Sequence, residues 1–145
     1  MITLEDIQKR KAAERYDLLW EMLKERTPAQ SISHTEMPTE ADHKRFVDNH
    51  PYSAWYFIVD TDNRDRVCGA IYLTDRREIG IHVFELYRNQ GIASAALLEL
   101  FRLHKGPFLA NINPENYGSM RLFEAHGFKH IQNTLKLGAD DAASR

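Results

Sequence analysis

Cysteine is almost absent from the sequence: Cys68 is the only one among 145 residues. One thiol cannot form an intrachain disulfide, and it cannot build a cysteine-based zinc site. Small domains held together by disulfides or by structural zinc are therefore excluded, and we expect no metal. A single cysteine is also typical of proteins from a reducing compartment, so we expect a cytoplasmic protein.

Long apolar runs and an excess of one charge are missing as well. No apolar stretch is long enough to span a membrane, and the opening MITLEDIQKR has no apolar signal core. Lys and Arg number 19 against 21 Asp and Glu, which gives a formal net charge of −2. Such a balance provides no general field to collect nucleic acid or anionic lipid, so any anion-binding site must be local.

Internal repeats, low-complexity tracts and linkers rich in Pro, Gly or Ser are also lacking. The chain is 43% hydrophobic and 10% aromatic, which is enough for one sizeable core. We therefore predict a single domain over residues 1–137. The last residues, GADDAASR, are predicted to form a flexible tail over 138–145.

The spacing of apolar residues predicts ten elements in the order β-α-α-β-β-β-α-β-α-β. This is an α/β (α+β) fold, with a mixed, mostly antiparallel sheet flanked by helices. In the helix after residue 91 we expect Ile92, Ala96, Leu100 and Leu103 to face inward. The expected strands are 1–4, 53–60, 67–74, 77–86, 108–112 and 128–137, and the expected helices are 9–26, 40–49, 92–105 and 114–126.

The stretch YRNQGIASAALLELF, residues 87–101, joins the strand at 77–86 to a long apolar helix. The first N–H groups of a helix lack intrahelical partners and carry partial positive charge, so they bind phosphate well. Gly91 permits a positive φ and close backbone approach, and Arg88 adds a forked cation. These residues predict a cradle for an anion such as a pyrophosphate. An ordinary strand-to-helix turn with a solvent-facing Arg88 stays open as the alternative.

Neither G-x-G-x-x-G nor G-x-x-x-x-G-K-[ST] occurs, so a dinucleotide fold and a P-loop are not supported. Arg88-x-x-Gly91-x-Ala93 instead resembles the [Q/R]-x-x-G-x-[G/A] signature of the GNAT superfamily of acyl-CoA-dependent N-acyltransferases. The later NPENYGSMRLFEAHGF resembles a second signature of that family, N-x-x-[SA]-x-x-[LF]-[YF]-x-x-x-G-F. Its positions are matched by Asn116, Ser119, Leu122, Phe123, Gly127 and Phe128.

The resemblance implies acetyl-CoA as co-substrate. It places the pyrophosphate beside Arg88 and on the backbone amides of Asn89, Gln90, Gly91, Ile92, Ala93 and Ser94. The pantetheine arm would lie between the strands at 78–84 and 108–112, held by main-chain groups near Val83 and Phe84, one of which could donate to the oxyanion. Asn116, with Ser119 and Phe123 on the same motif, would contact the arm. For Asn116 a helix cap is the alternative.

An amine must lose its proton before it can attack a thioester, since a lysine with a pKa of about 10.4 is almost wholly charged at pH 7. Glu78 and His82 are the candidate bases. For Glu78 the alternative is an exposed strand-end charge, and for His82 a half-buried structural role. Many relatives carry a tyrosine where this chain has Phe123, which cannot protonate a thiolate. The proton could then come from Tyr117, a neighbouring water or the amine itself, or the thiolate could leave unaided. The departure also leaves room for a non-catalytic acyl-CoA-binding module.

The acceptor side is expected at the connection between the first two helices, with His34 and Trp55 as substrate contacts. ISHTEMP and HPYSAWYFIV resemble small members of the family that modify amino sugars, often nucleotide-linked. We therefore expect an N-acetyltransferase acting by direct attack in a ternary complex, with an amino sugar as first acceptor and a small amine or protein amine as runner-up. No nucleic acid or membrane partner is expected, and a homodimer is left open.

Overall fold

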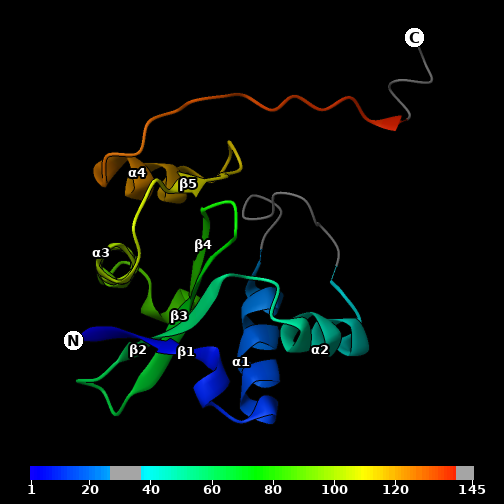
Figure 1. Ribbon diagram of the computed structural model, residues 1–145, viewed down its shortest axis with the longest axis vertical. Coiled ribbons are helices and arrows are strands. Elements are labelled where there is room, and N and C mark those ends of the chain that lie inside the picture. The colour runs from blue at the N-terminus through cyan, green and yellow to red at the C-terminus, as the bar shows by residue number, and fades with distance from the viewer. Residues whose placement is uncertain (27–36, 140–145) are drawn as a thin grey trace.

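A computed structural model describes residues 1–26 and 37–139 of the chain (Figure 1). The elements follow one another as β1 (Ile2–Asp6), η1 (Ile7–Lys9), α1 (Ala12–Glu25), α2 (Glu40–Asn49), β2 (Ala54–Asp60), β3 (Arg66–Leu73), β4 (Glu78–Val83), η3 (Glu85–Tyr87), α3 (Ile92–Leu103), β5 (Leu109–Ala110) and α4 (Tyr117–Ala125).

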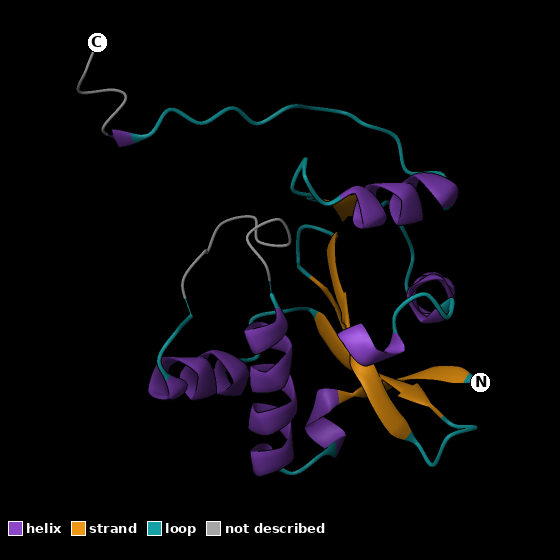
Figure 2. Ribbon diagram, turned by 180° about the vertical axis from the view of Figure 1, so that it is seen from behind, coloured by secondary structure: helices purple, strands orange, loops and turns teal. Residues whose placement is uncertain are grey.

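One sheet with the strand order β1-β2-β3-β4-β5 organises the molecule. The first three pairings are antiparallel, and β4 and β5 run parallel. Figures 1 and 2 show α1 and α2 together on one side of the sheet and α3 on the other. The predicted class, a mixed and mostly antiparallel sheet flanked by helices, is therefore confirmed.

Two apolar clusters cover the two faces of the sheet, so the central strands are buried on both sides. On the α3 face, Ile58 and Ile71 pack with Leu97 and Leu100, all with no exposed surface. On the α1 face, the cluster centres on Phe57, which is likewise fully buried. The predicted alternation along β4 is confirmed, since Ile79, Ile81 and Val83 join the α3-side cluster and His82 contacts α1.

Two helices begin or end at the residues that the sequence indicates. The Thr39 side chain accepts a hydrogen bond from the Asp42 N–H at 3.1 Å and starts α2. Gly127, with a φ of 90°, follows α4 at the expected position. The prediction for Leu103 was wrong: its side chain is 44% exposed. Leu103 is the last residue of α3, whereas Leu97 in the middle of that helix is fully buried.

The last predicted strand is not formed. Residues 128–137 are extended without a paired strand, and Ile131 and Leu135 are 72% and 92% exposed. Figures 1 and 2 show this segment running away from the sheet after α4. β5 is also shorter than predicted and not buried, since Leu109 is 40% exposed. A strand-like pattern becomes a strand only where a neighbouring edge is available to pair with it. Residues 140–145 of the predicted tail lie outside the described residues.

Candidate functional site

The opening between β4 and β5 is the first component of the site. The parallel ladder has only two pairs, Glu78 with Leu109 and Ile79 with Ala110. β4 continues to Val83, whereas β5 ends at Ala110. The second half of β4 therefore has one described neighbour, β3, and an unpaired edge on the β5 side. This geometry agrees with the predicted parting of the two strands.

Main-chain groups of β4 divide between its two edges. The Thr74 N–H donates to the Glu78 carbonyl at 2.9 Å, and the Phe84 N–H donates to the Cys68 carbonyl at 2.8 Å. In an antiparallel ladder the bonded positions alternate, so the even-numbered residues bond to β3 and the odd-numbered ones face the other way. Val83 therefore directs its N–H toward the opening. The Phe84 N–H, the other expected oxyanion donor, is already bonded within the sheet.

The entry to α3 is the second component. Asn89 and Gly91 have φ values of 62° and 75°, and no side chain caps the helix. Ala95 is the first residue whose N–H reaches back, to the Gly91 carbonyl at 3.1 Å. The N–H groups of residues 92–94 consequently have no intrahelical acceptor. A Cβ built on Gly91 would meet no atom within 4 Å, so the space above this turn is open.

The side chain of Arg88 lies back against β4. Its Nε donates to the Val83 carbonyl at 3.0 Å, and the side chain is 34% exposed. Nη2 lies 3.9 Å from Oε1 of Glu25 at the end of α1. Arg88 thus adds positive charge beside the loop while it fixes the end of the strand.

The chain around α4 supplies the next set of predicted residues, and its end contacts the start of α3. The Ser94 hydroxyl is 2.8 Å from Nε2 of His126, which follows the helix. Oδ1 of Asn116 accepts the Ser119 N–H at 3.1 Å, which is the capping contact. Phe123 is only 4% exposed and packs edge-on against Phe128, with ring centroids 5.0 Å apart. The structure therefore places Phe123 in the core.

His82 lies on the α1 face of β4 and is paired with a residue that no sequence motif singles out. Its Nε2 is 3.0 Å from Oε1 of Glu25, and the same oxygen accepts the Glu85 N–H at 3.0 Å. The His82 side chain is 14% exposed and that of Glu25 26%. Burial lowers the pKa of His82 below its ordinary value, against the raising effect of Glu25. Neutral imidazole is the form that can accept a proton.

Glu78, the other candidate base, lies at the closed end of the opening. Its Oε1 is 3.3 Å from the Thr74 hydroxyl, and Oε2 accepts a hydrogen bond from Nδ2 of Asn111. The Glu78 N–H in turn donates to the Thr74 hydroxyl at 3.0 Å. These contacts tie the strand end to the preceding turn and to the residue after β5.

An aromatic cluster lies on the α2 side of the sheet. The rings of Tyr52 and Tyr72 are stacked with centroids 3.8 Å apart, and Tyr52 packs edge-on against Trp55 at 4.7 Å. Trp55, a predicted substrate contact, is only 5% exposed and is therefore a buried member of the cluster. Phe46 is 47% exposed. His34, the other predicted substrate contact, lies outside the described residues.

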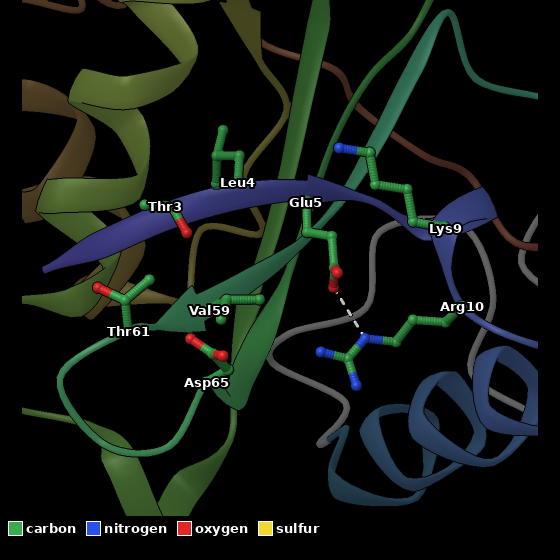
Figure 3. Close-up of a pocket in the computed structure, with 8 residues that line it drawn as sticks. All are labelled: Thr3, Leu4, Glu5, Lys9, Arg10, Val59, Thr61 and Asp65. Carbon is green, nitrogen blue, oxygen red and sulfur yellow. Dashed lines mark hydrogen bonds and ion pairs between the residues drawn. The ribbon is translucent and has the colours of Figure 1, made fainter.

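A separate hollow of about 370 Å³ lies between β1, η1 and the turn after β2 (Figure 3). Its charged residues include Glu5 and Arg10, which form an ion pair at 2.8 Å. None of the described residues that line it belongs to the predicted site. The described part of the chain also holds no group of three or more His, Cys, Asp or Glu placed to bind a metal ion. Of the described helices, none has the length and apolar character needed to cross a membrane.

Comparison with solved structures shows the same fold in several acetyltransferases. An N-acetyltransferase from Staphylococcus aureus Mu50 is 19% identical, with a TM-score of 0.63 and coverage of 91% of this chain and 84% of that one. RimL, a ribosomal L7/L12 alpha-N-protein acetyltransferase in complex with coenzyme A, is 15% identical, with a TM-score of 0.65 and coverage of 86% and 77%. YncA from Salmonella typhimurium, solved with its cofactor acetyl-CoA, is 17% identical, with a TM-score of 0.58 and coverage of 88% and 78%.

None of the curated proteins compared with the chain matches it. The family model is decisive, because it extends over both loop motifs and most of the sheet. The model of the acetyltransferase (GNAT) family matches residues 16–128, well over half of the sequence. This chain belongs to the acetyltransferase (GNAT) family.

Proposed function

We propose that this acetyltransferase moves an acetyl group from acetyl-CoA to a primary amine in a ternary complex. One observation carries the proposal: the unpaired edge of β4 leads through η3 directly to the uncapped entry of α3. A pantetheine arm needs main-chain partners along an extended path, and a diphosphate needs a cluster of N–H groups. The chain offers both within residues 81–94. The solved structures of RimL and YncA contain coenzyme A and acetyl-CoA respectively.

In the proposed reaction an ammonium group loses one proton to a base and the neutral amine attacks the thioester carbonyl. A C–N bond forms, the C–S bond breaks, and coenzyme A leaves as a thiolate that takes up the second amine proton. The Val83 N–H is our candidate donor to the oxyanion. A thiol pKa of about 8.5 makes the thiolate a tolerable leaving group without a general acid. Tyr117, which is 70% exposed at the start of α4, is the candidate acid if one is needed.

We assign the role of base to His82. Its neutral imidazole is partly buried beside the unpaired half of β4. Glu78 is engaged by Thr74 and Asn111 at the opposite, paired end of the strand. An imidazole whose pKa is near or below neutrality is mostly neutral at physiological pH. It can therefore accept a proton from an amine.

For the acceptor we propose an amino sugar, with nucleotide-linked sugars as the first class to test. The end of α1 brings Arg26 close enough to influence both His82 and Tyr52. The exposed ring of Phe46 belongs to the neighbouring aromatic cluster. An aromatic surface beside a cation suits a ligand that has apolar ring faces and polar substituents. A protein amine is the runner-up, since RimL is a protein acetyltransferase.

Two measurements test the proposal. Acetyl-CoA at a hundred times its Kd should raise the free energy of unfolding by about 2.7 kcal/mol and so raise Tm. A thiol-release assay should then show turnover with one class among nucleotide-linked amino sugars, polyamines and peptides with free α-amines. Stabilisation without turnover across the whole panel would identify a binding module instead. Absence of both binding and turnover would refute the proposal.

A further inference from the structure

Glu25 brings together three groups from different parts of the site. One of its oxygens, Oε1, lies 3.0 Å from His82 Nε2, 3.0 Å from the Glu85 nitrogen and 3.9 Å from Arg88 Nη2. His82 belongs to β4, Glu85 begins η3, and Arg88 precedes the open turn at Gly91. A single carboxylate on α1 therefore fixes the candidate base and the segment that leads to the entry of α3.

The other charges near His82 oppose its protonation. Arg26 after α1 and Arg88 after η3 both lower its pKa, as burial does to a larger extent, and Glu25 is the group that raises it. The ring of Phe84 packs edge-on against the imidazole at 6.3 Å and adds no charge. Glu25 is thus the only anionic group that the described surroundings of His82 place in contact with it.

We propose that Glu25 is a positioning residue for His82, and this inference rests on the proposed function. A carboxylate accepts a hydrogen bond but cannot donate one, so the neutral imidazole carries its hydrogen on Nε2 when it faces Glu25. Nδ1 is then the atom with a lone pair, and it is the atom that accepts the proton of the amine. Glu25 also stabilises the imidazolium formed at that moment, in the way a carboxylate supports a catalytic histidine in other enzymes.

The tautomer can be measured in the unmodified protein. Long-range ¹H–¹⁵N correlation spectra of the His82 ring distinguish hydrogen on Nε2 from hydrogen on Nδ1. We expect the Nε2–H form at a pH above the pKa of His82. A dominant Nδ1–H form would overturn the inference, and the measurement needs neither substrate nor a variant.

Glu25→Gln tests the charge, with Glu21→Gln as matched control one turn earlier on α1. Glu21 is 56% exposed and pairs with Lys24 at 2.7 Å, away from His82. In Glu25→Gln the pKa of His82 should fall and the acid limb of kcat/KM should move to lower pH. We expect kcat to decrease on the order of tenfold. KM for acetyl-CoA should change less than kcat, because the glutamine side-chain oxygen can still accept the Glu85 N–H that Glu25 accepts. Glu25→Asp, which retains the charge, should recover part of kcat.

The two proposals fail in different ways. A protein that turns over no amine would refute the proposed function, yet the His82 titration would still report whether Glu25 sets its pKa and tautomer. An active enzyme whose His82 titrates identically in wild type and Glu25→Gln would overturn the inference alone. A loss of activity with an unmoved acid limb would show a merely structural role for Glu25 and would also overturn it.

Discussion

At the scale of single residues, Gly91 determines how the first N–H groups of α3 are presented. Its φ is 75°, and a Cβ there would meet nothing within 4 Å. A β-branched side chain would have space there, but the left-handed backbone conformation disfavours it. This strain should cost about 1–2 kcal/mol of stability. In Gly91→Val we expect this strain to shift the turn and to raise the Kd for acetyl-CoA by about tenfold or more, measured by calorimetry.

Gly127 provides the matched control. It has a φ of 90° and equally open surroundings, but it follows α4 instead of preceding α3. Gly127→Val should lose a similar amount of stability in urea unfolding and keep its affinity for acetyl-CoA. If both variants bind as the wild type does, the turn at Gly91 does not hold the cofactor.

Asn116 and Thr39 allow a second comparison between matched residues. Each accepts an N–H at 3.1 Å from the residue three positions later and begins a helix. Replacing either by Ala should lower the free energy of unfolding by about 1 kcal/mol. Chemical denaturation of both variants checks this value. An Asn116→Ala protein that is as stable as the wild type but has a raised KM for acetyl-CoA would contradict the capping role and favour a cofactor contact.

At the scale of elements, a glycine on β4 leaves room for an aromatic ring of β3. A Cβ on Gly80 would lie 2.0 Å from the ring of Tyr72, which stacks on Tyr52. Gly80→Ala should therefore destabilise the protein by about 1–3 kcal/mol, the range for overpacked sites. Adding Tyr72→Ala should make the double variant more stable than the sum of the two single effects predicts, as a double-mutant cycle in urea would show.

Gly69 supplies the contrasting case on the same pair of strands. A Cβ on it would lie 2.0 Å from the carbonyl oxygen of His82, which is backbone. Trimming a side chain cannot relieve that clash, so Gly69→Ala should stay destabilised in the Tyr72→Ala background. Equal rescue of both glycine variants would show that the Tyr72 ring is not the obstacle at Gly80.

Elements that depend on local signals were predictable. Thr39 and Gly127 mark helix ends through contacts within a few residues, and the alternation in β4 depends only on its own side chains. The segment 128–137 shows the limit of this reasoning. Its pattern is that of a strand, but a strand also needs an edge to pair with, and the sequence does not specify where β5 ends.

At the scale of the whole molecule, burial of histidines links stability to pH. Burial lowers the pKa of both His82 and His104, so the unfolded chain binds protons more readily than the folded one. The stability contributed by the neutral forms is present above about pH 6.5, the ordinary value, and is lost as pH falls below it. We expect the urea midpoint to decrease between pH 7.5 and 5.5, and to decrease less in His82→Gln and His104→Gln. A midpoint that rises on acidification would contradict the assigned sign.

The candidate site was predictable only where its residues are close together in the sequence. Residues 88–94 form one continuous motif, so the amino-acid pattern alone indicates a helix entry there. Glu25 and His82 are 57 positions apart. Nothing local marks Glu25, which reads as one more charge on an amphipathic helix. The sequence also could not show that the Phe84 N–H is bonded within the sheet, because its bond to the Cys68 carbonyl depends on the register of β3 against β4.

That register has a consequence for how the protein tolerates change. The groups that β4 turns toward the opening are peptide N–H and C=O, which every amino acid except proline supplies alike. Replacing Ile81 or Val83 by another aliphatic residue should therefore leave recognition of the ligand intact. Proline at either position would remove an N–H donor. A single inserted residue would shift the alternation, so that groups now facing the opening would face β3 along the rest of the strand, and the reverse.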